Sequence, residues 1–308
     1  MITTTKARPG SADRPAPPIE GDDLDAYLAK GGFDAETEAF IGDLARDGVA
    51  RIDLGDDAVA VCDAALAQAS RWLDQPGVAR VQDAWRQAPA VRALATHPKV
   101  LRLLAAAYGR AAFPFQTLNF KHGTQQPLHS DCIHFSSLPE RFMCGVWVAL
   151  EDIHPDAGPL TYRPGSHRLP ITTMQAAGLN AGVAAPGDYE RLYIPAIAAQ
   201  ADAFPAREAV LKKGQAFVWA ANLIHGGAPI LDAARTRQSQ VTHYYFEGCQ
   251  YYTPLLSTAE TPHMRLPSNA LTGGWTWPRV KGRRARLPWR TVVDAAYLRL
   301  LRQPYAST

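Results

Sequence analysis

The spacing of apolar residues changes near Ala111, and this change constrains the fold more than any other feature of the 308-residue sequence. Before it, apolar residues recur about every 3.6 positions over 34–45, 57–73 and 100–108, a pattern typical of amphipathic helices. After it, apolar and polar residues alternate, and Gly, Pro, Asn and Asp separate the alternating segments. The sequence therefore predicts a helical N-terminal third followed by a strand-rich remainder.

The alternating segments predict short strands that pair mainly with one another. One of these segments, 48–54, lies between two of the predicted helices, and the others are 115–121, 127–131, 142–152, 159–163, 209–212, 216–219 and 238–247. Strands gathered in the second half, with helices ahead of them, favour an antiparallel double sheet covered by helices. The expected fold class is mainly β with flanking helices, as a cupin-like jelly roll (a double-stranded β-helix) buttressed by N-terminal helices.

The sequence predicts one domain over residues 21–308, after a disordered tail at 1–20 that offers almost nothing to bury. The domain divides into a helical part at 21–110, a jelly-roll core at 111–250 and a C-terminal extension at 251–308. An Ala-rich insertion at 171–203 interrupts the core. Both a lid over the barrel mouth and a surface elaboration are consistent with this insertion.

Charge and composition bound the function. A net charge of +3 is too small to indicate a nucleic-acid or membrane partner, and no apolar run is long enough to span a bilayer. The four cysteines are scattered without a C-x-x-C pair, which suits a reducing compartment. We therefore expect a cytoplasmic protein without a nucleic-acid or membrane partner, and the sequence leaves the oligomeric state open.

His129 and Asp131 lie two positions apart in one predicted strand, so their side chains would project from the same face. Two imidazoles and one carboxylate on one face of an octahedron form the site of non-heme Fe(II) oxygenases, and the other face stays open for a cosubstrate and O₂. His225, which follows the strand at 216–219 and precedes a glycine, is available as the third ligand. The alternative for His225, taken alone, is a structural histidine with satisfied hydrogen bonds.

Arg237 lies at the start of the last predicted core strand. An always-charged guanidinium can clamp a carboxylate with two hydrogen bonds, and an oxygenase that uses 2-oxoglutarate needs such a clamp for the carboxylate far from the metal. Arg235, two residues earlier, competes for this role. A surface arginine on an edge strand is the other interpretation.

These residues resemble, in order and approximate spacing, the phytanoyl-CoA dioxygenase family. The resemblance covers roughly residues 115–247 and rests on His129-Ser-Asp131, Trp147-Val-Ala-Leu-Glu-Asp, Gly158-Pro-Leu-Thr, Pro164-Gly-Ser-His167, His225-Gly and Arg237. It implies that His129, Asp131 and His225 bind Fe(II). It also implies that Arg237, rather than Arg235, holds 2-oxoglutarate, because the interval from Arg237 to His243 matches the family.

Other candidate site residues follow more loosely. The resemblance places Trp147 in the cosubstrate pocket, although a core aromatic on a buried strand fits this residue as well. Thr161 lies on the neighbouring predicted strand and could donate its hydroxyl to a carboxylate, while His167 sits in a predicted turn and is interpreted as structural. The side chains that could face a substrate cavity are Asn119, Lys121, Gln126, His134 and Trp219.

The function implied by the resemblance is oxidation, for example hydroxylation, of a small molecule with 2-oxoglutarate and O₂, releasing succinate and CO₂. The carboxylate of Asp131 favours this over halogenation, because halogenating relatives carry a small residue there and leave room for chloride. Nothing resembles a CoA cradle, so phytanoyl-CoA is not adopted as the substrate. A metal-binding cupin-type enzyme of another reaction class, and a non-catalytic binding module on the same barrel, are the alternatives.

Overall fold

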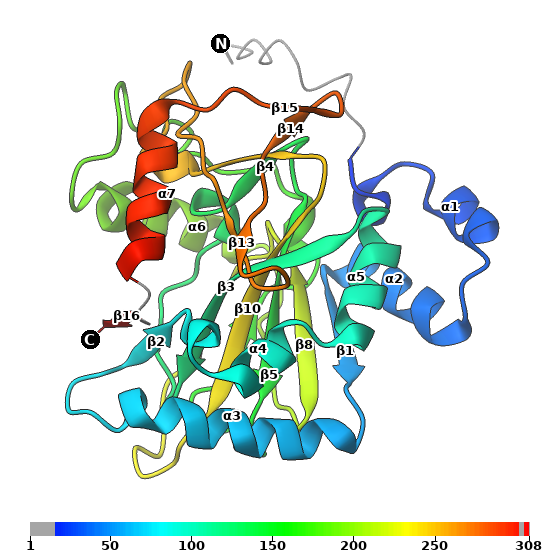
Figure 1. Cartoon of the computed structure of the whole chain (residues 1–308), viewed down its shortest axis with the longest axis vertical. Helices are drawn as coiled ribbons and strands as arrows, with labels where there is room; N and C mark the ends of the chain where they lie inside the picture. Colours follow the sequence, from blue (N-terminus) through cyan, green and yellow to red (C-terminus); the bar gives the residue numbers. More distant parts are fainter. Residues whose placement is uncertain (1–15, 302–304, 308) are drawn as a thin grey trace.

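A seven-stranded antiparallel sheet forms the centre of the computed structural model, which describes residues 16–301 and 305–307 (Figure 1). The strands lie in the order β1-β8-β5-β10-β3-β2-β16, and each neighbouring pair is antiparallel. Their bounds are β1 Val49–Asp53, β8 Gln215–Ala220, β5 Met143–Ala149, β10 Ser239–Phe246, β3 Ala112–Phe120, β2 Arg80–Gln82 and β16 Tyr305–Ser307.

A smaller sheet faces part of the large one. It has three strands in the order β7-β6-β9, and their bounds are β7 Arg207–Ala209, β6 Leu160–Tyr162 and β9 His225–Gly227. Leu160 and Tyr162 of β6 share one buried apolar cluster with Trp147 of β5 and Phe217 of β8. The protein is thus mainly β, with two sheets that bury a common apolar layer.

Three strand pairs lie outside these sheets. They are β4 Ser136–Leu138 with β11 Gln250–Tyr252, β12 Ser268–Asn269 with β13 Gly274–Trp275, and β14 Arg279–Val280 with β15 Arg283–Arg284. All but β4 belong to the C-terminal part of the chain, which crosses in front of the large sheet in the view of Figure 1.

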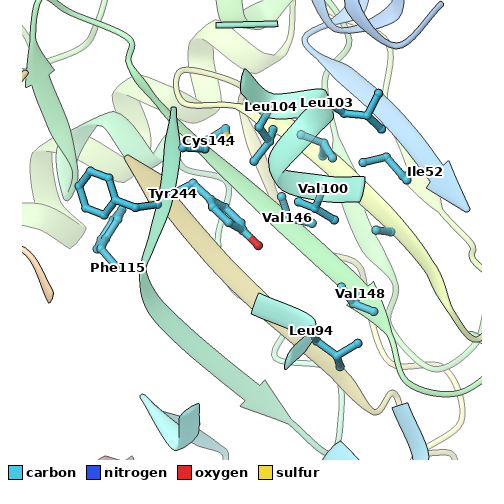
Figure 2. Packing of buried hydrophobic residues seen from close by; sticks show 14 of the residues in the cluster. Ile52, Leu94, Val100, Leu103, Leu104, Phe115, Cys144, Val146, Val148 and Tyr244 are labelled. Carbon is cyan, nitrogen blue, oxygen red and sulfur yellow. The ribbon is translucent and has the colours of Figure 1, made fainter. Parts of the chain in front are cut away.

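Helices from the N-terminal part cover the outer face of the large sheet (Figure 1). The N-terminal helices are α1 Leu24–Gly31, α2 Ala35–Asp47, α3 Asp57–Leu73, α4 Pro89–Ala95 and α5 Pro98–Tyr108, whereas α6 Ile194–Ala201 and α7 Trp289–Leu301 belong to later parts of the chain. In Figure 2, Leu94 of α4 and Val100 of α5 lie over Val146 and Val148 of β5, in one buried cluster. Within the described residues, no helix is both long and apolar enough to cross a membrane.

The alternation of side chains along the central strands separates the helix side of the sheet from the side that faces the smaller sheet. All seven residues of β5 are buried, yet Val146 and Val148 pack against the helices while Trp147 packs between the sheets. On β10, the Tyr244 hydroxyl donates to the carbonyl of Ala95 at the end of α4. Its neighbour His243 therefore projects to the opposite side, toward the smaller sheet.

The predicted helices at 34–45, 57–73 and 100–108 correspond to α2, α3 and α5. The predicted strand at 127–131 is wrong: His129 makes a single bridge to His225, and Asp131 already begins a 3-10 turn, Asp131–Ile133. The turn forms because the Ser130 side chain accepts the backbone N–H of Cys132 and so caps it. The strand predicted at 209–212 lies slightly earlier, at Arg207–Ala209.

The tail predicted at 1–20 divides into two parts. Residues 1–15 lie outside the described residues, whereas Pro18–Glu20 forms a 3-10 turn with Ile19 buried. The Glu20 carboxylate makes an ion pair with Arg141, although burial raises the pKa of Glu20 above its ordinary value. The packed chain therefore begins before residue 21, because a partner more than a hundred residues away holds Glu20.

Candidate metal centre

Three of the predicted site residues come together at the edge of the smaller sheet. His225 opens β9, and its backbone exchanges two hydrogen bonds, of 2.9 and 3.0 Å, with that of His129. Candidate ligand atoms of His129, Asp131 and His225 all lie within 4.8 Å of one another, and all three side chains are buried. Gly226 permits this approach, since a Cβ there would lie 2.7 Å from the carbonyl oxygen of Gln126.

Hydrogen bonds at the far side of each imidazole orient the two histidines. His129 Nδ1 lies 2.9 Å from the carbonyl oxygen of Pro127, and His225 Nδ1 lies 3.0 Å from that of Leu223. A carbonyl can only accept, so each Nδ1 carries the hydrogen and each Nε2 presents a lone pair. The Nε2 atoms lie 3.7 and 3.9 Å from the Asp131 carboxylate oxygens. This donor set, with its carbonyl partners, fits a divalent transition metal.

The electrostatics of the site favour metal-binding protonation states. Burial, reinforced by the neighbouring His225, lowers the pKa of His129 from its ordinary value to about 3, so its imidazole is neutral. Burial alone would raise the pKa of the Asp131 carboxyl. The neighbouring His225 and His243 lower this pKa by more than burial raises it, so the net shift is downward. A neutral imidazole beside an ionised carboxylate is the state in which these groups bind a metal.

Trp219 of β8 holds the carboxylate in place. Its indole Nε1 donates to Asp131 Oδ2 over 2.8 Å, and His243 Nε2 lies 3.5 Å from the same oxygen. Gly145 of β5 pairs in register with both Trp219 and His243. A Cβ at Gly145 would lie only 2.1 Å from the indole ring, so the indole reaches Asp131 because this position carries no side chain.

Gly145→Ala should therefore disturb the centre without touching a candidate ligand. We expect it to destabilise the fold by about 1–3 kcal/mol, because the buried indole must move and release Asp131. Gly42→Ala is the matched control: nothing lies within 4 Å of the added Cβ in α2, and alanine there should stabilise the helix by about 0.5–1 kcal/mol. Urea unfolding of both variants measures the difference, and wild-type stability in Gly145→Ala would contradict the assigned packing.

The centre opens into a cavity of about 810 Å³. Arg237 lines this cavity and is 5% exposed. Its guanidinium carbon lies 5.4 Å from the ring centroid of Trp147 and 5.7 Å from that of Phe120. Arg237 Nη2 makes a long hydrogen bond, 3.4 Å, to the carbonyl of His122, and Nε has no partner.

Within the described residues, no carboxylate pairs with the Arg237 guanidinium, and burial lowers its pKa to about 10. Arg235, the competing candidate, is instead 45% exposed and makes a 3.0 Å ion pair with Asp232. A buried cation with no counter-ion is unfavourable unless an anion joins it. Arg237 therefore has the properties of an anion-binding residue, and Arg235 does not.

The other predicted site residues divide into two groups. Gln126, His134, Trp147 and Trp219 line the cavity, and the Trp147 indole Nε1 is buried without a partner.

Three predicted residues lie elsewhere. Thr161 accepts a hydrogen bond from Arg163 and is absent from the cavity wall. The side chain of Asn119 is held by Gln240, on the helix side of the sheet, and Lys121 makes an ion pair with Asp74 at the end of α3. His167 is buried and bonds to the carbonyl of Ala45, in agreement with its predicted structural role.

Some residues that line the cavity were not predicted from the sequence. Gln116 Oε1 of β3 accepts a hydrogen bond from His243 Nδ1 at 3.0 Å, Tyr189 enters from the insertion, and Arg265 enters from the C-terminal extension. The insertion also contributes residues 184–187 and Glu190 to the cavity wall.

Residues 49–238, well over half of the chain, match the phytanoyl-CoA dioxygenase (PhyH) family. The chain belongs to this family. It is accordingly an enzyme of the non-heme iron and 2-oxoglutarate class. No curated protein sequence matches the chain.

Solved structures share the fold of this phytanoyl-CoA dioxygenase family member. The epimerase SnoN from nogalamycin biosynthesis, in complex with Fe³⁺, α-ketoglutarate and nogalamycin RO, is 23% identical with a TM-score of 0.54, over 70% of this chain and 86% of its own. EctD from S. alaskensis, with 2-oxoglutarate and 5-hydroxyectoine, is 18% identical with a TM-score of 0.55, over 83% and 88%. The carbocyclase SnoK is 16% identical with a TM-score of 0.55, over 72% and 87%.

Proposed function

We propose that the protein is an Fe(II)- and 2-oxoglutarate-dependent dioxygenase that hydroxylates, or otherwise oxidises, a small molecule and releases succinate and CO₂. The observation that carries the proposal is Arg237, a buried cation without a carboxylate partner among the described residues, in the cavity that also contains the three clustered residues. A dicarboxylic keto acid matches this arrangement, because one end can pair with a guanidinium while the other end chelates a metal.

His129, Asp131 and His225 would hold the iron, and Trp219 fixes the orientation of the carboxylate. When bound, the iron and 2-oxoglutarate supply the oxidising chemistry, in which decarboxylation to succinate is coupled to oxidation of the substrate by O₂. Arg237 Nε and Trp147 Nε1 are two buried donors that have no partner in the described part of the chain, and they are available for the distal carboxylate of 2-oxoglutarate. The arginine and the tryptophan would thereby set the position of the keto acid relative to the metal.

The remaining role of the protein is to place the substrate and exclude water. Leu118, Val241 and Leu160 give the cavity apolar walls, and residues 184–190 of the insertion lie along it. We propose that this insertion acts as a lid, that the two facing sheets form the predicted jelly roll, and that residues 21–308 work as one domain. The related structures include an epimerase and a carbocyclase, so hydroxylation is proposed here as one of several oxidations that such a centre supports.

Anaerobic addition of Fe(II) and 2-oxoglutarate tests the proposal. The complex should develop the weak visible charge-transfer band of an iron-chelated keto acid. At a concentration of 2-oxoglutarate about 100 times its Kd, the native state should gain about 2.7 kcal/mol. Absence of the band, together with an unchanged melting temperature at saturating 2-oxoglutarate, would show that the centre performs another reaction.

A further inference from the structure

Arg265 gives the cavity a second cationic position, supplied by the part of the chain beyond the family match at 49–238. Its Nη1 donates to the Thr253 hydroxyl over 3.1 Å and makes a longer contact, 3.5 Å, with the carbonyl of His134. Its guanidinium carbon lies 4.9 Å from the ring centroid of Phe135 and 5.9 Å from that of Phe115. These contacts hold the guanidinium at the cavity wall, and no carboxylate in the described part of the chain makes an ion pair with it.

Arg265 and Arg237 lie at opposite ends of the cavity. Both guanidinium groups lie near rings of β3, Arg237 near Phe120 and Arg265 near Phe115. Phe115 and Phe120 lie five positions apart on β3, a rise of about 17 Å along a regular strand. His243 Nε2 lies 3.5 Å from Asp131 Oδ2, and the His243 ring stacks on Phe115 with 6.0 Å between the ring centroids. The metal centre is therefore closer to the Arg265 end of the cavity.

The charge around Arg265 favours an anion. Arg80 also lines this cavity. Only two acidic residues line the cavity within residues 16–301: Asp131, which faces the candidate metal centre, and Glu190, which is exposed on the insertion. With the proposed iron bound to Asp131, the wall near Arg265 would carry excess positive charge.

Apolar side chains surround this positive charge. Phe135, Leu255 and Leu256 line the cavity, and both leucines come from the C-terminal extension like Arg265 itself. A ligand that satisfies both features has an apolar or ring-shaped body and one oxyanion, and a carboxylate can pair with a planar guanidinium through two parallel hydrogen bonds.

We propose that the substrate is a small carboxylic acid whose carboxylate pairs with Arg265, so that its apolar body extends over the metal centre. This inference rests on the proposed function and deepens it by naming the substrate class. Because Arg265 lies outside the segment that matches the family, it would select the substrate, whereas Arg237 would bind the shared cosubstrate.

Binding to the anaerobic complex of the protein with Fe(II) and 2-oxoglutarate tests the inference without turnover. The probes are L-leucine, L-phenylalanine, L-proline and octanoate, each compared with its own carboxamide, and phenyl phosphate as a different oxyanion. Two readouts are used, the melting temperature and the perturbation of the charge-transfer band. At least one carboxylate should bind about tenfold or more tightly than its carboxamide, since a charge-assisted hydrogen bond contributes about 1.5–3 kcal/mol.

Arg265→Gln should abolish the preference for the carboxylate and weaken binding of that acid by about tenfold. Arg265→Lys should retain part of the preference for the carboxylate, because the positive charge remains. This variant separates the effect of the charge from the loss of the hydrogen bond to Thr253. Arg283→Gln, an exposed arginine of β15, is the matched control and should bind like the wild type. All three should form the 2-oxoglutarate band unchanged.

The two proposals fail separately. If the band forms normally but no carboxylate binds better than its carboxamide, or if Arg265→Gln binds the acid as the wild type does, the substrate inference is wrong. Tighter binding of phenyl phosphate than of any carboxylate would also overturn it. If the wild type forms no band, the proposed cosubstrate itself is wrong.

Discussion

Replacing His225 by alanine is expected to lower 2-oxoglutarate turnover by more than about a hundredfold, since even the loss of a residue that only supports a ligand reduces metal affinity or activity 10- to 100-fold. The variant keeps the backbone hydrogen bonds between residues 225 and 129, so the edge of the smaller sheet should persist. Stability in the absence of metal should therefore stay within about 1 kcal/mol of the wild type. Succinate release and Fe(II) binding measure the loss of the ligand, and urea unfolding of the same preparation without metal measures the stability.

His154→Ala provides the control for this variant, because the His154 side chain is 42% exposed and absent from the cavity wall. It should retain wild-type turnover and iron binding. Succinate release at the wild-type rate in His225→Ala would exclude His225 as a ligand. A preparation that is unfolded without metal would show instead that the imidazole holds the sheet edge together.

The pairing of His129 with Asp131 was predictable from the sequence, although a continuous strand is not what produces it. The two side chains share one face because Ser130 between them is extended, with φ −115° and ψ 136°. Two side chains at positions i and i+2 share a face when the one residue between them is extended, and a whole strand is not required. The prediction therefore identified the side-chain geometry correctly even though the structure replaces the predicted strand by a bridge and a 3-10 turn.

Errors among the substrate residues have a different origin. Strand β3 carries polar side chains on both faces, with Gln116 toward the cavity and Asn119 toward the helices. Alternation alone cannot say which face of such a strand is the inner one. The sequence also gave no local signal for Arg265, because its place in the cavity depends on contacts with Phe115 and Phe135, more than a hundred residues away along the chain.

Arg237→Met should make the protein without cosubstrate more stable while abolishing its response to 2-oxoglutarate. Burial lowers the pKa of Arg237 from 12.5 to about 10, which means that the folded state disfavours the charged form. The guanidinium remains charged at neutral pH, so this opposition to folding is fully present below pH 10. Methionine removes the buried charge and should stabilise the fold by about 1–3 kcal/mol. We expect a value near the lower end, because the contacts of the guanidinium with Trp147 and Phe120 are lost.

The same variant should lose the stabilisation that 2-oxoglutarate gives the wild type, and its affinity for the keto acid should fall by about 30-fold or more, because a buried charge pair contributes about 2 kcal/mol or more. Arg235→Met is the matched control: an exposed arginine in an ion pair with Asp232 should change stability by no more than about 0.5 kcal/mol and leave 2-oxoglutarate binding intact. Urea unfolding with and without 2-oxoglutarate separates the two effects. A variant that is less stable in both conditions would show that Arg237 supports the fold, whereas opposite effects in the two conditions are expected only if the position is kept cationic for an anion that binds there.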